Sequence, residues 1–410
     1  MALTQIRSKE SDIFEKLIIL SLLFSPILQT YGWGKYDFSF ILTSVLSVIY
    51  LVKNKFRNTL PKVLLYYFLY RLLIHEISAS ELSSLIPLGI VKSLLAFVMF
   101  FGIKNYVFFV KSYKKIALVC IIFFFFQEIT YILFGHRVSG VIEQLPLALD
   151  VDDASGWYSS LKDNSRSSSF FSEPAMFVQF LLPLLSIELF SHNRNYIFAL
   201  LIASTLLFTL SGNAMFGLAI VGLMYLYSLV KKSKGFSGAI LASIVAAVMI
   251  IVGVTFASSE KGQEVMARSY QLSSNSMETR GAGKSGFIRI YRGYGVYAEF
   301  GTFQKLFGND DTKYFTTQMY KSDVSMFFGE NDTYVNTFQS FLICTGMVGV
   351  VFFILIFCYI WKNTDIAGRS ILITFYGLSF LSGLYLTDTM ALYLMLPLLR
   401  TNYLQAKTYK

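Results

Sequence analysis

Long apolar runs, separated by short polar segments, repeat along almost the whole chain. The hydrocarbon core of a bilayer is about 30 Å thick, so a helix needs roughly 20 apolar residues to cross it. The pattern therefore predicts an all-α, polytopic integral membrane protein, with about 12 transmembrane helices in a single domain over residues 1–410. The expected helices lie near residues 13–30, 38–52, 60–78, 83–103, 116–134, 171–190, 196–210, 213–230, 236–257, 333–361, 370–386 and 388–400. The last two could also form one bent span or a re-entrant hairpin, so the expected count is about 10–12.

The amino-acid composition supports the membrane assignment. Of the 410 residues, 55% are hydrophobic and only 15% are charged, which argues against a soluble fold. A net charge of +10 would favour binding to nucleic acid only if the cations lay on a water-exposed fold, so no nucleic-acid partner is expected. The cysteines Cys120, Cys344 and Cys358 lie in apolar runs with no histidine cluster beside them. We therefore expect neither a metal site nor a disulfide framework.

The distribution of lysine and arginine orients the predicted helices, because short cytoplasmic loops retain these cations. With the N-terminus inside, about 20 of the 35 cations fall in the inner segments. The short outer loops hold only Lys35. No signal-peptide cleavage site follows the first apolar run, so we expect it to be an uncleaved span. An N-in, C-in topology follows.

Two outer loops, over residues 135–170 and 258–332, are unusually long, and loops of this length are commonly functional. The second loop is basic up to Arg292 and acidic from Gly293 to Asp332. The two parts could line opposite sides of one cavity, or they could form a solvated loop of mixed charge. Together the two loops hold twelve cations: Arg137, Lys162, Arg166, Lys261, Arg268, Arg280, Lys284, Arg289, Arg292, Lys305, Lys313 and Lys321.

Four of these cations are closely spaced. Arg280 and Lys284 are four positions apart, and Arg289 and Arg292 are three apart, so a helix or glycine turn would bring them together. The planar guanidinium of arginine suits phosphate oxygens. A lipid-linked diphosphate at the outer leaflet is the expected anion, with anionic lipid as the simpler alternative.

Several other features have ordinary explanations. GAGKS at 281–285 imitates a phosphate-binding P-loop, but Glu278 stands where that motif requires glycine. The doublets Asp152–Asp153 and Asp310–Asp311 are interpreted as solvent-exposed loop residues rather than as metal-binding pairs. Snorkelling or pairing between helices explains the charges inside or near apolar runs, which are Arg71, Lys92, Glu128 and Glu188.

The first long loop runs into an apolar helix through Arg166, Ser172, Glu173 and Pro174. Proline in a first helical turn costs no hydrogen bond, and a carboxylate there meets the positive end of the helix dipole. A purely structural interpretation is available, in which Ser172 caps the helix and Glu173 pairs with its dipole.

The stretch RSSSFFSEPAMF also resembles the Arg-x-x-x-Phe-x-Glu-Pro signature of Wzy-type O-antigen and capsule repeat-unit polymerases, a superfamily shared with O-antigen ligases. The number of spans, the arginine-rich second outer loop and the segment 333–353, which contains Gly346 and Gly349, are similar to that family as well. Two features depart from the family pattern, the first of them from that of its ligase-like members. No histidine occurs in 330–334, and Asn213 stands where many members have arginine.

The resemblance implies a GT-C-like membrane glycosyltransferase in the bacterial inner membrane, with its site facing the periplasm. The substrate would be an undecaprenyl-diphosphate-linked oligosaccharide, and a chain-length regulator and a flippase are possible partners. Glu173 or Asp332 would accept the proton of the attacking hydroxyl. No metal or other cofactor is expected, because cationic side chains would bind the diphosphate: Arg280, Arg289 and Arg292 first, then Arg166 and, more weakly, Lys284. An O-antigen ligase, a lipid-linked sugar transporter or flippase, and a lipid-binding scaffold are the alternatives.

Overall fold

The computed structural model covers the chain from end to end, and the description is confined to part of it. The described residues are 2–33, 36–54, 60–78, 88–142, 144–148, 166–191, 194–232, 240, 243, 292–310, 317–318, 321–322 and 335–408. Structural statements below concern these residues alone.

The described part of the chain is almost entirely helical, which confirms the all-α prediction. Its eleven long helices are α1 (Ala2–Leu28), α2 (Phe38–Lys53), α3 (Lys62–Ser78), α4 (Leu88–Gly102), α5 (Tyr106–Phe134), α7 (Pro174–Phe190), α8 (Tyr196–Phe208), α9 (Gly212–Lys232), α16 (Thr337–Lys362), α17 (Ile366–Leu378) and α18 (Asp388–Thr408). Two short helices, α13 (Gly293–Ala298) and α14 (Thr302–Phe307), belong to the second long loop, and β1 (Gly32–Trp33) pairs antiparallel with β2 (Tyr36–Asp37). The helix predicted at 236–257 lies outside the described residues, apart from positions 240 and 243.

By length and composition alone, three described helices, α5, α9 and α16, are long and apolar enough to cross a bilayer. Shorter apolar helices are α2, α4, α7, α8 and α17. Large apolar side chains are exposed along the outer faces, for example Ile122, Leu73 and Ile354. Exposed apolar surface of this extent is unusual for a water-soluble monomer and suits contact with lipid. The fold is that of an all-α membrane protein.

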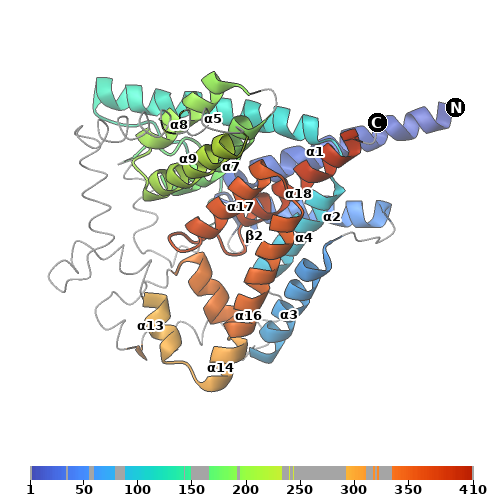
Figure 1. The fold of residues 1–410 in the computed structure, drawn as a ribbon, viewed down its shortest axis with the longest axis vertical. Coiled ribbons are helices and arrows are strands. Elements are labelled where there is room, and N and C mark those ends of the chain that lie inside the picture. Colours follow the sequence, from blue (N-terminus) through green and yellow to red (C-terminus); the bar gives the residue numbers. More distant parts are fainter. Residues whose placement is uncertain are drawn as a thin grey trace.

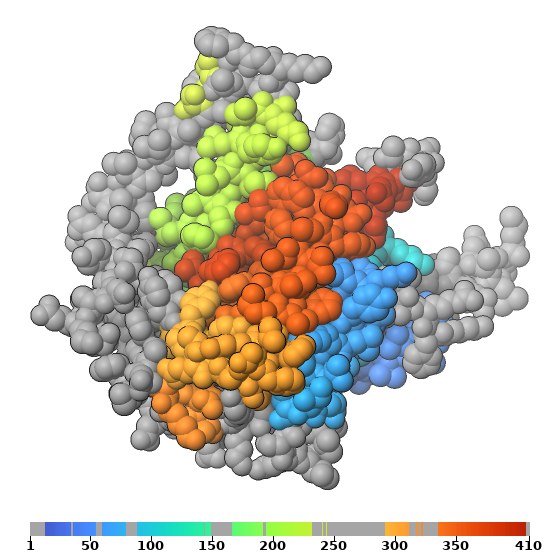
Figure 2. All heavy atoms as spheres, turned by 60° about the horizontal axis from the view of Figure 1, so that its bottom comes forward, coloured from blue at the N-terminus to red at the C-terminus, as the bar shows by residue number. Residues whose placement is uncertain are grey.

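Most of the helices form an upper and a lower group joined through α17 and α18, whereas α1 and α4 pack against α18, with α2 packed on both (Figure 1). Helices α5, α7, α8 and α9 make the upper group, and α3, α13, α14 and α16 make the lower one. Nearly every side chain of α7 is buried, so this helix forms the centre of the upper group. The space-filling view shows α13 and α14 beside α3 and α16 on the lower face (Figure 2). Part of the second long loop is thereby packed against the helices.

Helix α16 is folded back on itself at Gly346, where φ is 59° and ψ is −161°. The ring centroids of Phe338 and Phe353 are 5.5 Å apart, and those of Phe341 and Phe353 are 4.8 Å apart. A straight helix would separate residues 338 and 353 by about 22 Å, at 1.5 Å per residue. The single span predicted over 333–361 is therefore wrong in shape: the segment is a hairpin with arms 337–345 and 347–362.

Close backbone contacts explain why this turn requires glycine. A Cβ atom on Gly346 would overlap the carbonyl oxygen of Leu306 and would lie 2.6 Å from the nitrogen of Gly308. Gly308 also has positive φ, at 83°, and a Cβ there would lie 2.5 Å from the Cα of Thr345. The turn of α16 and the end of α14 thus interlock through two glycines, whose conformations other residues rarely adopt.

We expect Gly346→Ala to destabilise the protein clearly. The backbone conformation alone should cost about 1–3 kcal/mol for a residue with a Cβ atom, and the overlap with Leu306 adds to this. The measurement is the midpoint of thermal unfolding of the purified protein in detergent. Gly89→Ala is the matched control, because a Cβ atom there meets only Leu386 Cδ1, at 3.8 Å. Equal unfolding midpoints for the two variants would contradict the conclusion that the turn at Gly346 requires glycine.

A second interruption of helical structure separates α17 from α18. The helix predicted over 370–386 ends at Leu378, and residues 379–387 form a non-helical segment, which we call the α17–α18 connection. Ser379 and Leu384 in this connection are fully buried. Non-helical backbone at membrane depth is tolerated only where it is buried in protein or lines a water-filled cavity. The α17–α18 connection is therefore a candidate for the functional site.

Candidate functional site

The α17–α18 connection is held by side chains from the beginnings of three other helices. Gln179 of α7 donates its Nε2 to the hydroxyl of Ser382 at 2.7 Å, and Asn213 of α9 donates its Nδ2 to the same oxygen at 3.0 Å. Thr337 of α16 donates its N–H and its hydroxyl to the Ser382 carbonyl, at 2.9 and 2.6 Å. All four side chains are buried. We call Gln179, Asn213, Thr337 and Ser382 the polar junction.

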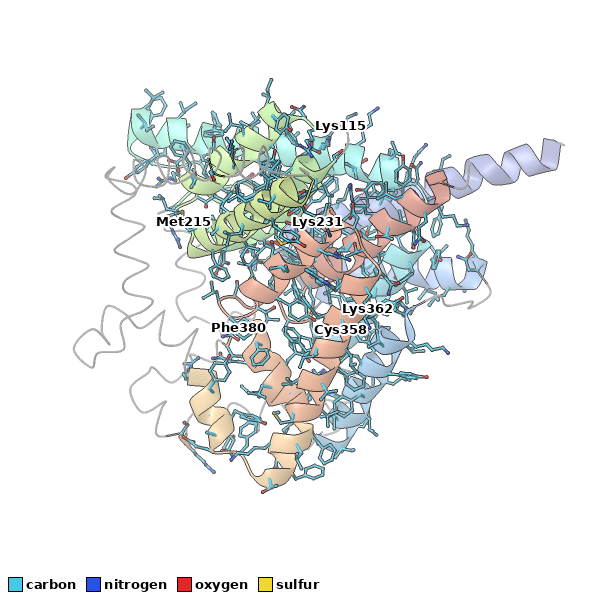
Figure 3. All side chains as sticks on the ribbon, viewed as in Figure 1. Lys115, Met215, Lys231, Cys358, Lys362 and Phe380 are labelled. Carbon is cyan, nitrogen blue, oxygen red and sulfur yellow. The ribbon has the colours of Figure 1, made fainter. Side chains whose placement is uncertain are left out.

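The first turn of α16 is fixed independently by a capping box. The Asn336 side chain accepts from the N–H of Gln339 at 2.8 Å, and the Gln339 side chain accepts from the N–H of Asn336 at 3.1 Å. Asn336 also donates to the carbonyl of Phe380, which is labelled in Figure 3, at 3.0 Å. These bonds place the positive end of the α16 dipole beside the polar junction.

Arg292 is the N-cap of α13 and directly precedes Gly293, which packs against the same turn of α16. Its side chain is only 1% exposed. A Cβ atom on the neighbouring Gly293 would come within 2.6 Å of Cδ of Gln339, so the backbone at the start of α13 touches the α16 capping box. Arg292 is thus a buried cation close to the first turn of α16, and a guanidinium is a favourable partner for a phosphate-like anion.

The segment that carries the polymerase-like motif is anchored to α5. Ser169 has a positive φ of 57°, donates its N–H to Gln127 at 2.9 Å and donates its hydroxyl to the Cys120 carbonyl at 2.7 Å. The rings of Phe170 and Phe123 stack at 4.3 Å. The motif is therefore a tightly packed turn rather than a free loop.

Glu173 and Arg166 of this motif differ in their burial and in their relation to α7. Glu173, not Ser172, is the N-cap of α7, and its side chain does not cap the helix. Ser172 donates instead to the sulfur of Met176 at 3.0 Å, so the predicted serine cap is wrong. Pro174 is the first helical residue, as expected. Arg166 is exposed, whereas Glu173 is half-buried at the start of the helix that carries Gln179 of the polar junction.

The structure thus relates two of the predicted site residues to one junction. Glu173 is the N-cap of α7, which reaches the polar junction through Gln179. Arg292 directly precedes Gly293, whose backbone touches Gln339 in the first turn of α16. Arg166 is on the segment just before Glu173. Arg280, Lys284, Arg289 and Asp332, also predicted as site residues, lie outside the described residues.

A buried ion-pair cluster holds the second long loop against α3. The Nη2 atom of Arg71 is 2.7 Å from Oδ1 of Asp310, and Nδ1 of His75 is 3.0 Å from Oδ2 of the same carboxylate. Arg71 also donates to the Cys344 carbonyl at 3.1 Å. Asp310 is therefore not the solvating loop residue that we predicted. We call Arg71, His75 and Asp310 the loop clamp.

The loop clamp lies beside the turn of the α16 hairpin. Tyr70 donates its hydroxyl to the carbonyls of Phe307 and Thr345, at 2.8 and 3.0 Å. The guanidinium of Arg71 lies 5.4 Å from the centre of the Tyr385 ring in the α17–α18 connection. These contacts fasten the end of segment 292–310, and hence the loop that contains Arg292, to the helices around the junction.

The other embedded charges are also paired, two of them with residues at or in other helices. Lys92 lies 3.0 Å from carboxylate oxygens of both Asp37 and Asp388. Glu188 pairs with Lys114 at 2.6 Å, and Glu128 pairs with Arg137 at 3.4 Å. The partners Asp37 and Asp388 could have been suspected from the sequence, because each precedes or begins a predicted helix. The pairs of Lys92 and Glu188 connect helices, whereas the Glu128–Arg137 pair holds the loop that follows α5, and none of them contains a group that points to bond-making chemistry.

The charge around the junction suits anion binding. Burial raises the pKa of Tyr294 and Tyr297 in α13, so both phenols stay neutral near Arg292. Within the described ranges, no group of three or more His, Cys, Asp or Glu side chains could hold a metal ion. Arg292 is therefore the group near the junction whose charge suits a phosphate-like anion.

The chain was also compared with known proteins. No protein family, no curated protein and no solved structure matches it.

Proposed function

We propose that this protein is a bacterial inner-membrane glycosyltransferase that polymerises undecaprenyl-diphosphate-linked repeat units into O-antigen or capsular polysaccharide on the periplasmic face. The observation that carries the proposal is the buried Arg292, whose neighbour Gly293 packs on the first turn of α16. That turn belongs to the polar junction, which also receives α7, the helix that begins at the Glu173–Pro174 motif. The resemblance of this motif to that of Wzy-type polymerases points to the same chemistry.

In the proposed reaction, the oxygen of an acceptor sugar hydroxyl attacks the anomeric carbon of the lipid-linked donor. The bond from that carbon to the diphosphate oxygen breaks, and undecaprenyl diphosphate leaves with the electron pair. Arg292 stabilises the charge that develops on the diphosphate, aided by Arg166, Arg280, Arg289 and Lys284. The hydroxyl proton passes to a carboxylate, either Glu173 or Asp332.

The proposed topology has 12 spans with both termini in the cytoplasm. It is supported by contacts at the end of the bundle away from the polar junction. Arg400, near the end of α18, donates to Asp365 at 2.8 Å, to the Tyr106 hydroxyl at 3.2 Å and to the Phe190 carbonyl at 3.4 Å. Helices α5 and α17 thus begin at the same end of the bundle at which α7 and α18 end. By contrast, α7, α9 and α16 begin at the other end, beside the polar junction. This alternation fits the cation bias that orients the chain.

One observation favours a second candidate function, that of a lipid-linked sugar flippase or transporter. Both α16 and the α17–α18 pair are interrupted within apolar segments, and discontinuous helices often form the substrate sites of transporters. The polymerase proposal ranks first because the interruptions adjoin the long loop that bears Arg292. A ligase ranks lower, because 330–334 contains no histidine.

Deleting the gene and separating the surface glycans by gel electrophoresis tests the proposal. A polymerase is expected to leave lipid A core that carries a single repeat unit, or single units on the lipid carrier for a capsule, and wild-type protein should restore the ladder. Long chains that accumulate on the carrier would identify a ligase instead. Single units that stay inaccessible from the periplasm would identify a flippase. An unchanged ladder would contradict all three.

A further inference from the structure

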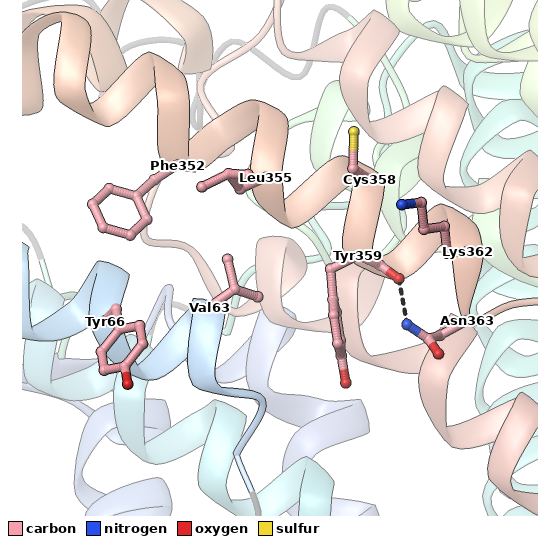
Figure 4. A pocket seen from close by; sticks show the side chains of 8 residues that line it. All are labelled: Val63, Tyr66, Phe352, Leu355, Cys358, Tyr359, Lys362 and Asn363. Carbon is pink, nitrogen blue, oxygen red and sulfur yellow. Dashed lines mark hydrogen bonds between the residues drawn. The ribbon is translucent and has the colours of Figure 1, made fainter.

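A groove lies between α3 and the second arm of α16, well away from the polar junction. Its volume is about 430 Å³. Figure 4 shows that most of its lining is apolar or aromatic, from Val63 and Tyr66 on one side and from Phe352, Leu355 and Tyr359 on the other. This shape and lining suit a hydrocarbon chain.

The groove ends at positive charge. Lys362, the last residue of α16, lines this end, and Lys62, the first residue of α3, precedes the lining residue Val63. Lys62 is exposed, and neither lysine forms an ion pair with a described residue. Asn363, beside Lys362, donates its side-chain N–H to the Tyr359 carbonyl at 2.8 Å, so the lining at this end of the groove also includes a polar side chain. The two ammonium groups are therefore available to an anion.

The surfaces on both sides of the groove are apolar and exposed. On α3 they include Leu69 and Leu73, and on α16 they include Val351 and Ile354, all more than half exposed. In a membrane protein such faces contact lipid, so the groove opens to the bilayer rather than to water. An apolar trough that ends at lysines between helices matches the chemistry of a phospholipid with an anionic headgroup.

We infer that this groove binds an anionic phospholipid, with one acyl chain along Phe352 and Leu355 and the phosphate at Lys62 and Lys362. The site is separate from the proposed active site. Lys362 lies three residues before Asp365, which pairs with Arg400 at the opposite end of the bundle from the polar junction. The inference is therefore independent of the proposed reaction.

Cys358 offers a direct test, because it lines the groove and is exposed, whereas Cys120 is buried and Cys344 is half-buried. The rate of Cys358 modification by N-ethylmaleimide is measured by mass spectrometry on protein purified in detergent. Dioleoylphosphatidylglycerol should slow the reaction several-fold, and dioleoylphosphatidylcholine at the same mole fraction should not. Since each lysine near a membrane surface contributes roughly fivefold in affinity, the protecting concentration should rise on the order of 25-fold in Lys62→Gln/Lys362→Gln.

The matched control is Lys111→Gln/Lys115→Gln, which removes two exposed lysines of α5 and should leave the protection unchanged; Lys115 is labelled in Figure 3. Equal protection by the two phospholipids in the wild-type protein would overturn the inference. So would protection by phosphatidylglycerol that survives in Lys62→Gln/Lys362→Gln. Undecaprenyl phosphate is added in a third arm. Protection by it at lower concentration than phosphatidylglycerol would assign the groove to a polyprenyl phosphate and would also overturn the phospholipid assignment.

Discussion

Purified Asp310→Ala protein is expected to unfold at a markedly lower temperature than the wild type. The substitution leaves Arg71, which is 1% exposed, without the carboxylate that now lies 2.7 Å from its guanidinium. Removing one partner of a buried ion pair typically costs about 3–5 kcal/mol, because the remaining charge is both desolvated and uncompensated. His75 loses its contact with the same carboxylate. Thermal unfolding in detergent, followed by intrinsic fluorescence, measures the change.

A double variant separates the ion pair from simple packing. Replacing both charges, as in Arg71→Met/Asp310→Leu, should recover most of the lost stability, since well-packed apolar residues can replace a buried pair at little cost. Glu128→Ala is a useful comparison, because its pair with Arg137 is longer, at 3.4 Å, and should matter less. If Asp310→Ala and Glu128→Ala lowered stability equally, the loop clamp would have no special role.

The apolar pattern predicted the positions of the helices well and their interruptions poorly. All eleven long helices overlap predicted apolar runs, although α1 and α5 begin about ten residues earlier than predicted, because run length and hydrophobicity are local properties of the chain. The fold of α16 at Gly346 depends instead on Leu306 and Gly308, about 40 residues earlier, against which the turn packs. The apolar pattern continues through the turn without a break, so the sequence alone could not place it. The same holds for the α17–α18 connection, whose partners come from α7, α9 and α16.

Charge spacing identified candidate residues but not their partners. The sequence identifies Arg71 and Lys92 as embedded charges, yet it assigns Asp310 to solvent because Asp310 lies within the predicted outer loop. Its burial arises from packing of α14 on the turn of α16, which no local signal reveals. Asn213 was noted only as a departure from a family pattern, although its amide helps to form the polar junction. Hydrogen bonds between distant segments account for most of what sequence reasoning missed.

The proposed reaction depends most strongly on Arg292, and its charge can be separated from its packing. The side chain is buried, so Arg292→Ala would leave a cavity as well as remove the cation. Arg292→Met keeps most of the volume without the charge, and Arg292→Lys keeps the charge without the planar donors. Loss of one donor to a developing anion commonly lowers turnover by about 10²–10³. We expect such a loss in Arg292→Met, and a smaller loss in Arg292→Lys, because lysine binds phosphate as a point charge.

The test is complementation of the deletion strain, with the glycan ladder compared at equal protein levels in the membrane. Arg292→Met should leave single repeat units, whereas Arg292→Lys should give a faint ladder of long chains. Arg369→Ala is the matched control, because this arginine of α17 stacks on Trp361 at 5.0 Å, on the side away from the polar junction. It should complement fully. A normal ladder from Arg292→Met would show that the reaction does not need the charge of Arg292. A defect of the same size in Arg369→Ala would show that loss of an arginine elsewhere is enough to impair the protein. Only a charge-dependent defect confined to Arg292 supports a guanidinium that stabilises the departing diphosphate.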